Sequence, residues 1–260
     1  MKRLKLFAKG NVDVFDSLHS CRIGGELLWN GINEVLRVRH PGVLARLRHE
    51  TSTAARGLLH PPAIEGRLLE RPGLIAPYPL GLQASQEIFT TDADVVILSI
   101  LPDVAMHHFR HRRNGEHLFV NDPAAWDAAD IGWLNDSYSL TNLPPVDEVF
   151  EHYLTIIDRI QAGGDKPILI YNMSPVAPGP IAHCFLGLED SYSTRIRRFN
   201  LMLVELSERT GVSVIDVETV VAKAGAERVK LDMGHLTAEG NRLVAEEVAR
   251  VLEDYGLLDD

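Results

Sequence analysis

Residues 95–100 are Val95-Val96-Ile97-Leu98-Ser99-Ile100, a continuous apolar run that is rich in β-branched side chains. A run of this kind, stopped by Pro102, predicts a strand that is buried on both faces, as in a parallel sheet. Further short strands are expected at Val12 to Phe15, Ile168 to Tyr171 and Val212 to Val217, and a weaker one at Val43 to Arg48. The chain is therefore expected to contain five strands.

Apolar residues at helical spacing separate these strands. The expected helices are Gly24 to Val38, Val149 to Ile160, Ile196 to Leu206 and a last one that begins near Thr237, a good N-cap. Alternating strands and helices predict a doubly wound α/β sheet, whose working site lies beyond the carboxyl ends of the strands. We interpret residues 1–260 as a single domain with an insertion, or cap, at about 103–147, which is too long for an ordinary connection.

Composition excludes several classes of function. The chain has 260 residues, 45% of them hydrophobic and 24% charged, with a formal net charge of −10. This acidity argues against nucleic acid as a partner. Apolar runs long enough for a membrane span or a signal peptide are missing from the sequence. The two cysteines, Cys21 and Cys184, are too far apart in the sequence for a metal or redox motif. We expect their thiols to be unpaired and the protein to be cytoplasmic.

Two places combine polar side chains that suit nucleophilic catalysis. Ser17 follows the first expected strand, and Asp232 and His235 lie between the last strand and the last helix. A serine needs a base to become a nucleophile, and a histidine needs an acceptor on its other ring nitrogen. We therefore expect Ser17 to attack, His235 to carry the proton and Asp232 to orient the imidazole.

These residues resemble the motifs of the GDSL/SGNH hydrolases, which are esterases and acyl hydrolases. The resemblance rests on Val14-Phe15-Asp16-Ser17-Leu18 and on Asp232-Met233-Gly234-His235-Leu236-Thr237-Ala238-Glu239-Gly240. It implies a flavodoxin-like three-layer α/β/α sandwich with a five-stranded parallel sheet. It also implies a Ser17–His235–Asp232 triad and an oxyanion hole to which the backbone N–H of Ser17 contributes.

The sequence departs from that pattern at the remaining motifs. Phe15 stands where the family has a glycine, and Pro102 stands where its oxyanion-hole asparagine belongs. Gly57 is a distant candidate for the missing glycine. The insertion offers asparagines that are candidates to replace the missing donor, and these are Asn121, Asn135 and Asn142.

The insertion also carries a basic, histidine-rich stretch. Asn114-Gly115 predicts a hairpin turn there. Four histidines around the turn are a candidate metal site, and these are His107, His108, His111 and His117. Their spacing favours a solvated hairpin, so we expect no metal there. The neighbouring arginines are candidates to dock an anionic group, and the aromatic residues Trp126, Trp133 and Tyr138 to stack on a sugar.

The sequence thus favours a serine-dependent ester hydrolase that needs no cofactor and acts on a small-molecule ester or an acylated glycan. Two alternatives stay open. One is a catalytically degenerate protein of the same fold that binds a ligand or partner. The other is an acyltransferase that uses the same serine.

Overall fold

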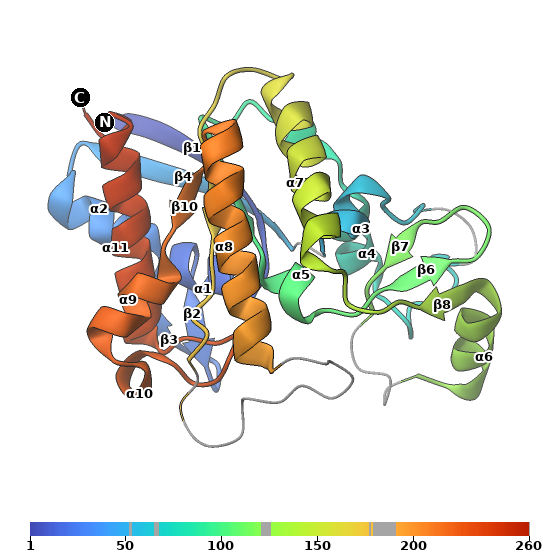
Figure 1. The fold of residues 1–260 in the computed structure, drawn as a ribbon. Coiled ribbons are helices and arrows are strands. Elements are labelled where there is room, and N and C mark those ends of the chain that lie inside the picture. Colours follow the sequence, from blue (N-terminus) through green and yellow to red (C-terminus); the bar gives the residue numbers. More distant parts are fainter. Residues whose placement is uncertain (52–53, 65–67, 121–125, 177, 179–190, 260) are drawn as a thin grey trace.

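A five-stranded parallel sheet forms the centre of the protein (Figure 1). The computed structural model describes residues 1–51, 54–64, 68–120, 126–176, 178 and 191–259. In spatial order the strands are β10 (Ser213–Ile215), β9 (Ile168–Tyr171), β5 (Val95–Ser99), β1 (Lys2–Gly10) and β4 (Val43–Thr51). The chain moves from β1 to β4 on one side and then crosses to β5 on the other. This order has its topological switch point between β1 and β5, where ligands bind in such sheets.

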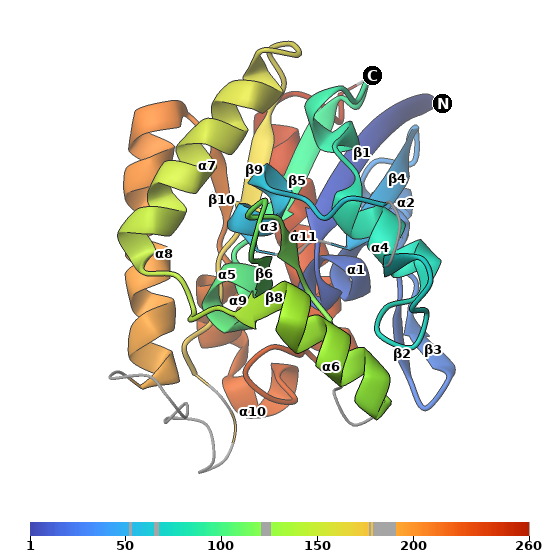
Figure 2. The ribbon, with the colours of Figure 1, turned by 90° about the vertical axis from the view of Figure 1, so that its right-hand side faces the viewer.

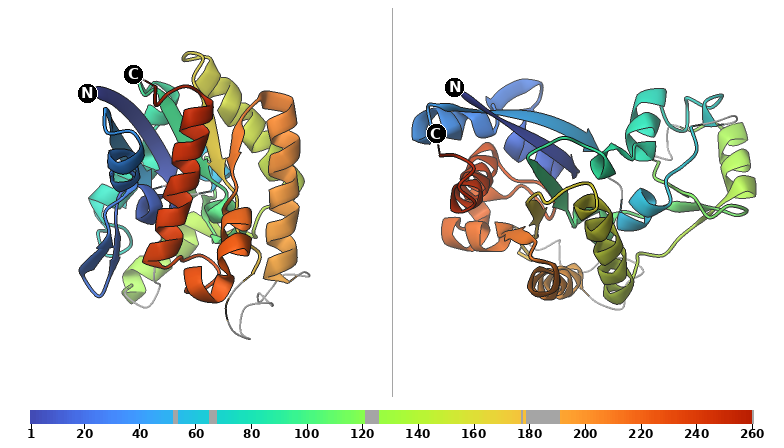
Figure 3. Two further views of the ribbon diagram at one scale, coloured as in Figure 1. Left: turned by 90° about the vertical axis from the view of Figure 1, so that its left-hand side faces the viewer. Right: turned by 90° about the horizontal axis from the view of Figure 1, so that it is seen from above.

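Helices cover both faces of the sheet, which confirms the three-layer α/β/α sandwich (Figures 2 and 3). One face packs on α1 (Val12–Leu18), α2 (Ile32–Arg39), α9 (Val217–Ala224) and α11 (Ala238–Asp254). The other packs on α3 (Ala55–Leu59), α7 (Val146–Gln161) and α8 (Tyr192–Thr210). Strand residues point alternately into the two layers: Leu6 belongs to the first and Phe7 to the second. Such two-sided burial explains the unbroken apolar runs.

The first strand is not the one that the sequence predicted. The strand expected at 12–15 is the start of helix α1, and the true strand β1 runs from Lys2 to Gly10. Asn11 caps the helix because its side-chain oxygen accepts a hydrogen bond from the N–H of Val12 at 2.8 Å. Tertiary packing overrides the β-propensity of Val12 and Val14, since Val14 is buried against the sheet.

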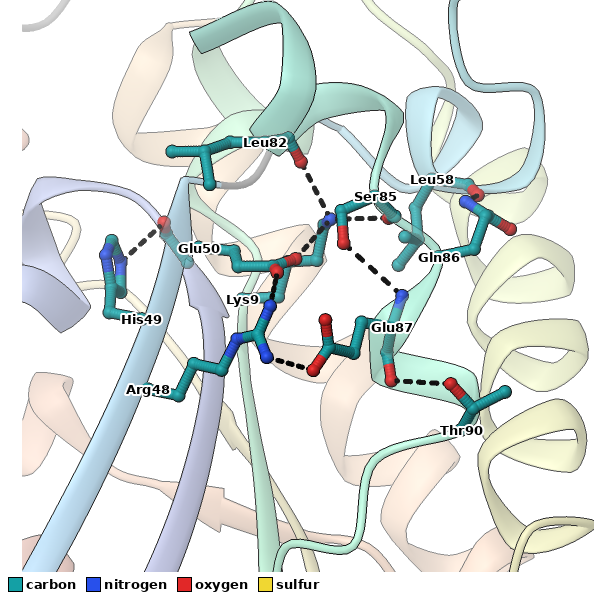
Figure 4. Close-up of polar contacts among 11 residues, drawn as sticks. Lys9, Arg48, His49, Glu50, Leu58, Leu82, Ser85, Gln86, Glu87 and Thr90 are labelled. Atoms are coloured by element: carbon teal, nitrogen blue, oxygen red, sulfur yellow. Dashed lines mark hydrogen bonds and ion pairs between the residues drawn. The ribbon is translucent and has the colours of Figure 1, made fainter. Parts of the chain in front are cut away.

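A buried ion pair at the end of β1 explains why this strand is hard to recognise from sequence (Figure 4). Lys9 is 1% exposed, and its ammonium group donates to Glu50 on β4 at 3.1 Å. It also donates to the main-chain oxygens of Leu82 and Ser85. Glu50 accepts a second bond from Arg48. A lysine in this position is tolerated in the core because all its donors have acceptors.

The helix expected from Gly24 to Val38 is shorter than predicted and is preceded by a hairpin. Strands β2 (Cys21–Ile23) and β3 (Glu26–Trp29) pair around Gly24-Gly25, whose φ angles of 59° and 87° favour glycine. Helix α2 begins only after Gly31. A β-carbon on Gly31 would lie 2.3 Å from the main-chain oxygen of Leu18, so a side chain does not fit there.

The remaining elements of the sandwich follow the predictions closely. Strands β4 and β9 and helices α7, α8 and α11 include the expected segments, β5 ends one residue before the expected Ile100, and Thr237 caps α11. Strand β10 is shorter than expected, because Val217 already belongs to α9. Within the described residues, no helix combines the length and apolar character that crossing a membrane requires.

The segment after β5 adds α5 (Leu101–Ala105) and a small antiparallel sheet in the order β7-β6-β8. Its elements are β6 (Phe109–His111), β7 (His117–Leu118), α6 (Ala128–Ser137) and β8 (Tyr138–Leu140). The hairpin turn at Asn114-Gly115 is confirmed. A separate apolar cluster joins this sheet and α6 to α4 (Pro77–Ala84), and the short 3-10 helix η2 (Glu87–Phe89) follows α4. Trp133 packs against Tyr138 in this cluster, with ring centroids 5.7 Å apart.

Candidate active site

The switch point between β1 and β5 holds a buried carboxyl group. Ser99, the last residue of β5, donates its hydroxyl to Asp13 in the first turn of α1. Burial raises the pKa of Asp13, although the hydrogen bond from Ser99 opposes the shift. The other carboxyl oxygen of Asp13, Oδ1, is buried and has no hydrogen-bond partner among the described residues. This edge of the sheet therefore carries a polar group, Oδ1 of Asp13, whose hydrogen-bonding capacity the described residues leave unused.

A histidine–aspartate pair lies at the same end of the sandwich, in the loop before α11. The Nδ1 atom of His235 is 2.8 Å from Oδ2 of Asp232 and 2.9 Å from Oδ1. Both side chains are about half exposed, at 50% and 59%. Nε2 of His235 has no partner among the described residues, so the ring presents one free nitrogen. The two predicted partners are thus in contact.

The local sequence explains how this pair is held. Asp232 Oδ1 accepts the main-chain N–H groups of Gly234 and His235, both at 2.8 Å, which closes a tight turn. Burial opposes ionisation, but these N–H groups and the imidazole together hold the pKa of Asp232 below its ordinary value. Gly240 lets α11 approach this loop closely, because a β-carbon there would lie 2.3 Å from the oxygen of Val229.

The structure places Ser17 differently from the expected nucleophile. Ser17 is the penultimate residue of α1 and is 0% exposed. Its hydroxyl lies 2.7 Å from the main-chain oxygen of Asp13, 3.2 Å from that of Val14 and 3.1 Å from the hydroxyl of Tyr171. The described contacts do not include one between Ser17 and His235. In this conformation the hydroxyl is a satisfied group of the interior and is closed to substrate.

The true end of β1 explains why Ser17 does not lie where the sequence predicts it. In α/β hydrolytic enzymes the nucleophile sits in the turn from a strand to the next helix, where it is exposed. Because β1 ends at Gly10, that turn contains Gly10, Asn11 and Val12, none of which has a hydroxyl or thiol. Ser17 lies more than one helical turn beyond it. Asp16, its neighbour, is half-buried, and burial raises its pKa while the charge of His235 lowers it.

Among the described residues predicted for the oxyanion hole, Gly57, Asn135 and Ser17 have no described contact with His235. The N–H of Gly57 donates to the oxygen of Ala54 at 2.8 Å, so it is not free to bind an oxyanion. Asn135 is exposed on α6, which lies far from α10 (Ala226–Val229) and α11 (Figures 1 and 3). The N–H of Ser17 lies within the turns of α1, where helical hydrogen bonding uses it. Asn121 is outside the described residues.

Sequence reasoning missed a buried lysine beside the histidine–aspartate pair. Lys230 is 4% exposed, and its ammonium group donates to the main-chain oxygens of Ser174 at 3.1 Å and Met233 at 3.2 Å. Burial lowers its pKa to about 8, an effect that Asp232 opposes. Its place two residues before Asp232 was the only available signal, and lysines are usually exposed.

Two histidines of the insertion, His108 and His117, are buried side chains. His108 accepts a hydrogen bond from the N–H of Ala54, and burial lowers its pKa to about 3. His117 is also buried, and its ring centroid lies 6.0 Å from that of His108. Within the part of the chain that the structure describes, no three His, Cys, Asp or Glu side chains are grouped to hold a metal ion.

Comparison with known proteins supports the fold. No protein-family model and no curated protein sequence matches the chain. Among solved structures, the acetyl xylan esterase AlAXEase is similar with a TM-score of 0.53 and 14% identity, over 96% of this chain and 100% of that one. A protein from Slackia heliotrinireducens assigned to the SGNH hydrolases gives 0.54 and 13%, over 96% and 100%. The chain has the SGNH-hydrolase fold.

A third similar solved structure is also named as an acetylxylan esterase. The acetylxylan esterase Axe2 of Geobacillus stearothermophilus is similar with a TM-score of 0.53 and 12% identity, over 95% of this chain and 93% of that one. At such low identity the similarity establishes the SGNH fold but transfers no activity. The resemblance drawn from the sequence motifs is therefore confirmed at the level of the fold.

Proposed function

We propose that this SGNH-fold protein is an ester hydrolase in which His235 is the general base and a water molecule is the nucleophile. The observation that carries the proposal is the contact of Nδ1 of His235 with both carboxylate oxygens of Asp232, at 2.9 and 2.8 Å. This contact fixes the imidazole so that Nε2 is the proton acceptor. Esters of acetic acid on a saccharide are the substrate class that the similar esterases suggest.

The reaction requires two proton transfers. The oxygen of water attacks the ester carbonyl carbon while Nε2 of His235 takes its proton, and Asp232 stabilises the imidazolium that forms. The tetrahedral intermediate then breaks its bond to the alcohol oxygen, which receives that proton. The products are a carboxylic acid and an alcohol. The mechanism predicted from sequence, with Ser17 as nucleophile, requires α1 to release the Ser17 hydroxyl from Tyr171.

Hydrolysis of p-nitrophenyl acetate and of acetylated xylan tests the proposal. We expect His235→Gln to lower kcat by about 10²–10⁴, the usual contribution of a general base. His40→Gln, at the far end of α2, is the matched control and is expected to be as active as the parent. Ser17→Ala is expected to keep its activity. Equal loss in Ser17→Ala and His235→Gln, with a fluorophosphonate adduct on Ser17, would overturn the water mechanism in favour of the serine.

One observation favours a second candidate function. The turn from β1 to α1 lacks a nucleophilic side chain, which suits a protein that keeps the SGNH fold but binds a ligand without turnover. A folded parent that hydrolyses none of the esters would refute the enzyme and support this binding protein. Product analysis with an added alcohol distinguishes hydrolysis from acyl transfer, since transfer yields a new ester.

A further inference from the structure

Lys230 is a buried cation that the proposed mechanism leaves without a role. An ammonium group has three N–H donors, and those of Lys230 have two main-chain acceptors, Ser174 and Met233. These bonds join the end of β9 to the loop that carries the histidine–aspartate pair. The third donor has no partner among the described residues. An uncompensated buried donor costs free energy, so it calls for an acceptor.

A small cavity is lined in part by Lys230. It has a volume of about 20 Å³, and its lining includes Lys230, Asp13, Tyr171, Met233 and Gly234. A space of about this size accepts one oxygen-sized group. Asp13, one of the lining residues, has a buried Oδ1 without a hydrogen-bond partner among the described residues. Two residues with polar side chains, from opposite parts of the chain, thus line one space that is also lined by Met233 and Gly234 of the loop of the histidine–aspartate pair.

We propose that this cavity is an oxyanion and carboxylate site, in which Lys230 and Asp13 bind one oxygen of the acyl group. In the reaction it receives the carbonyl oxygen of the ester as that oxygen gains negative charge, and afterwards an oxygen of the carboxylate product. The proposal rests on the proposed function for its role in catalysis. Its ligand class, a carboxylate, is testable without turnover.

The charges around the cavity suit an anion. Lys230 is positively charged at neutral pH, since its pKa is about 8. Burial raises the pKa of Asp13, so its carboxyl group is biased toward the neutral form, which donates a hydrogen bond. Tyr171 is neutral as well, because burial raises its pKa. The nearby carboxylate of Asp232 favours the charged form of Lys230, and its own oxygens contact Nδ1 of His235.

Such a site would replace the oxyanion donor that the chain lacks at Pro102. At the position where the resemblance places an oxyanion-binding asparagine, the chain has Pro102, which lies in α5 and has no N–H. Loss of one oxyanion donor costs an esterase about 10²–10³ in rate. A preorganised ammonium group beside the reacting carbonyl provides the same stabilisation from another direction.

Acetate binding and ester hydrolysis by Lys230→Met test the inference. Lys223→Met, which changes an exposed lysine of α9, is the control. We expect sodium acetate, compared with sodium chloride at equal ionic strength, to raise the Tm of the parent and of Lys223→Met but not of Lys230→Met. We expect kcat to fall by about 10²–10³ in Lys230→Met. Methylamine is expected to restore part of the activity of Lys230→Ala, which a purely structural lysine would not allow.

The two readouts separate this inference from the proposed function. Acetate binding that depends on Lys230 in a protein without hydrolysis would support the site and refute the enzyme. Hydrolysis that depends on His235 with an unchanged kcat in Lys230→Met would refute the site alone. Acetate binding that is equal in the parent and Lys230→Met overturns the inference. If Lys230→Met fails to fold, Lys230→Gln, which keeps neutral N–H donors, replaces it in both assays.

Discussion

Ser17→Ala distinguishes a structural serine from a catalytic one. The serine hydroxyl is 3.1 Å from that of Tyr171, and both groups are completely buried. Without the serine hydroxyl, the tyrosine hydroxyl keeps no described partner, and an unsatisfied buried polar group costs about 1–3 kcal/mol. The free energy of unfolding in urea should fall by that amount, while kcat for p-nitrophenyl acetate stays within about twofold of the parent value.

A double-mutant cycle with Tyr171→Phe makes the argument quantitative. Replacing both partners by apolar groups leaves no orphaned donor, so Ser17→Ala/Tyr171→Phe should lose less stability than the sum of the two single variants. Additive losses would show that the two hydroxyls do not interact. A Ser17→Ala protein with the stability of the parent and no activity would refute the structural interpretation and restore the serine mechanism.

Three further outcomes are expected. Lys9→Met should lower the free energy of unfolding by about 3 kcal/mol, because it leaves Glu50 buried with only one cation; equal urea curves would contradict this. The pKa of Lys230 falls from 10.5 in the unfolded chain to about 8 in the folded protein, so between these pH values the unfolded chain binds more protons. The contribution of Lys230 to the free energy of unfolding should therefore rise with pH in this range, while the activity falls as Lys230 loses its charge. Lys230→Met should flatten both profiles. Gly31→Ala should lower Tm, since its β-carbon would collide with the oxygen of Leu18.

Local signals explain which parts of the structure could be predicted from sequence. The runs at 95–100 and 168–171 are almost entirely apolar, with Ser99 as the exception, because both of their faces are covered, so sequence and structure agree. Asp232 and His235 could also be predicted to meet, because they are three residues apart in one turn that ends at a capping threonine. Contacts that depend on a few neighbouring residues leave a clear pattern in the sequence.

The first strand and the serine could not be predicted in the same way. The burial of Lys9 depends on Glu50, 41 residues away, and a lysine-rich segment gives no sign that it will lie in the centre of a sheet. The sequence predicts a strand at 12–15, where the structure has the start of α1, and it therefore puts Ser17 at a strand end that does not exist. The burial of Lys230 depends likewise on Ser174, 56 residues earlier in the chain.

The distribution of polar groups at the carboxyl edge supports the proposal of a site centred on His235 rather than on the turn from β1 to α1. The switch point between β1 and β5, where such sheets bind ligands, holds the Asp13–Ser99 contact, and the strand-to-helix turn beside it has no nucleophile. His235 nevertheless keeps a carboxylate on one nitrogen and an open second nitrogen. A binding site has no need of an oriented base, whereas a water-activating site needs that base and a separate source of positive charge, for which Lys230, buried two residues before Asp232, is the candidate that we propose.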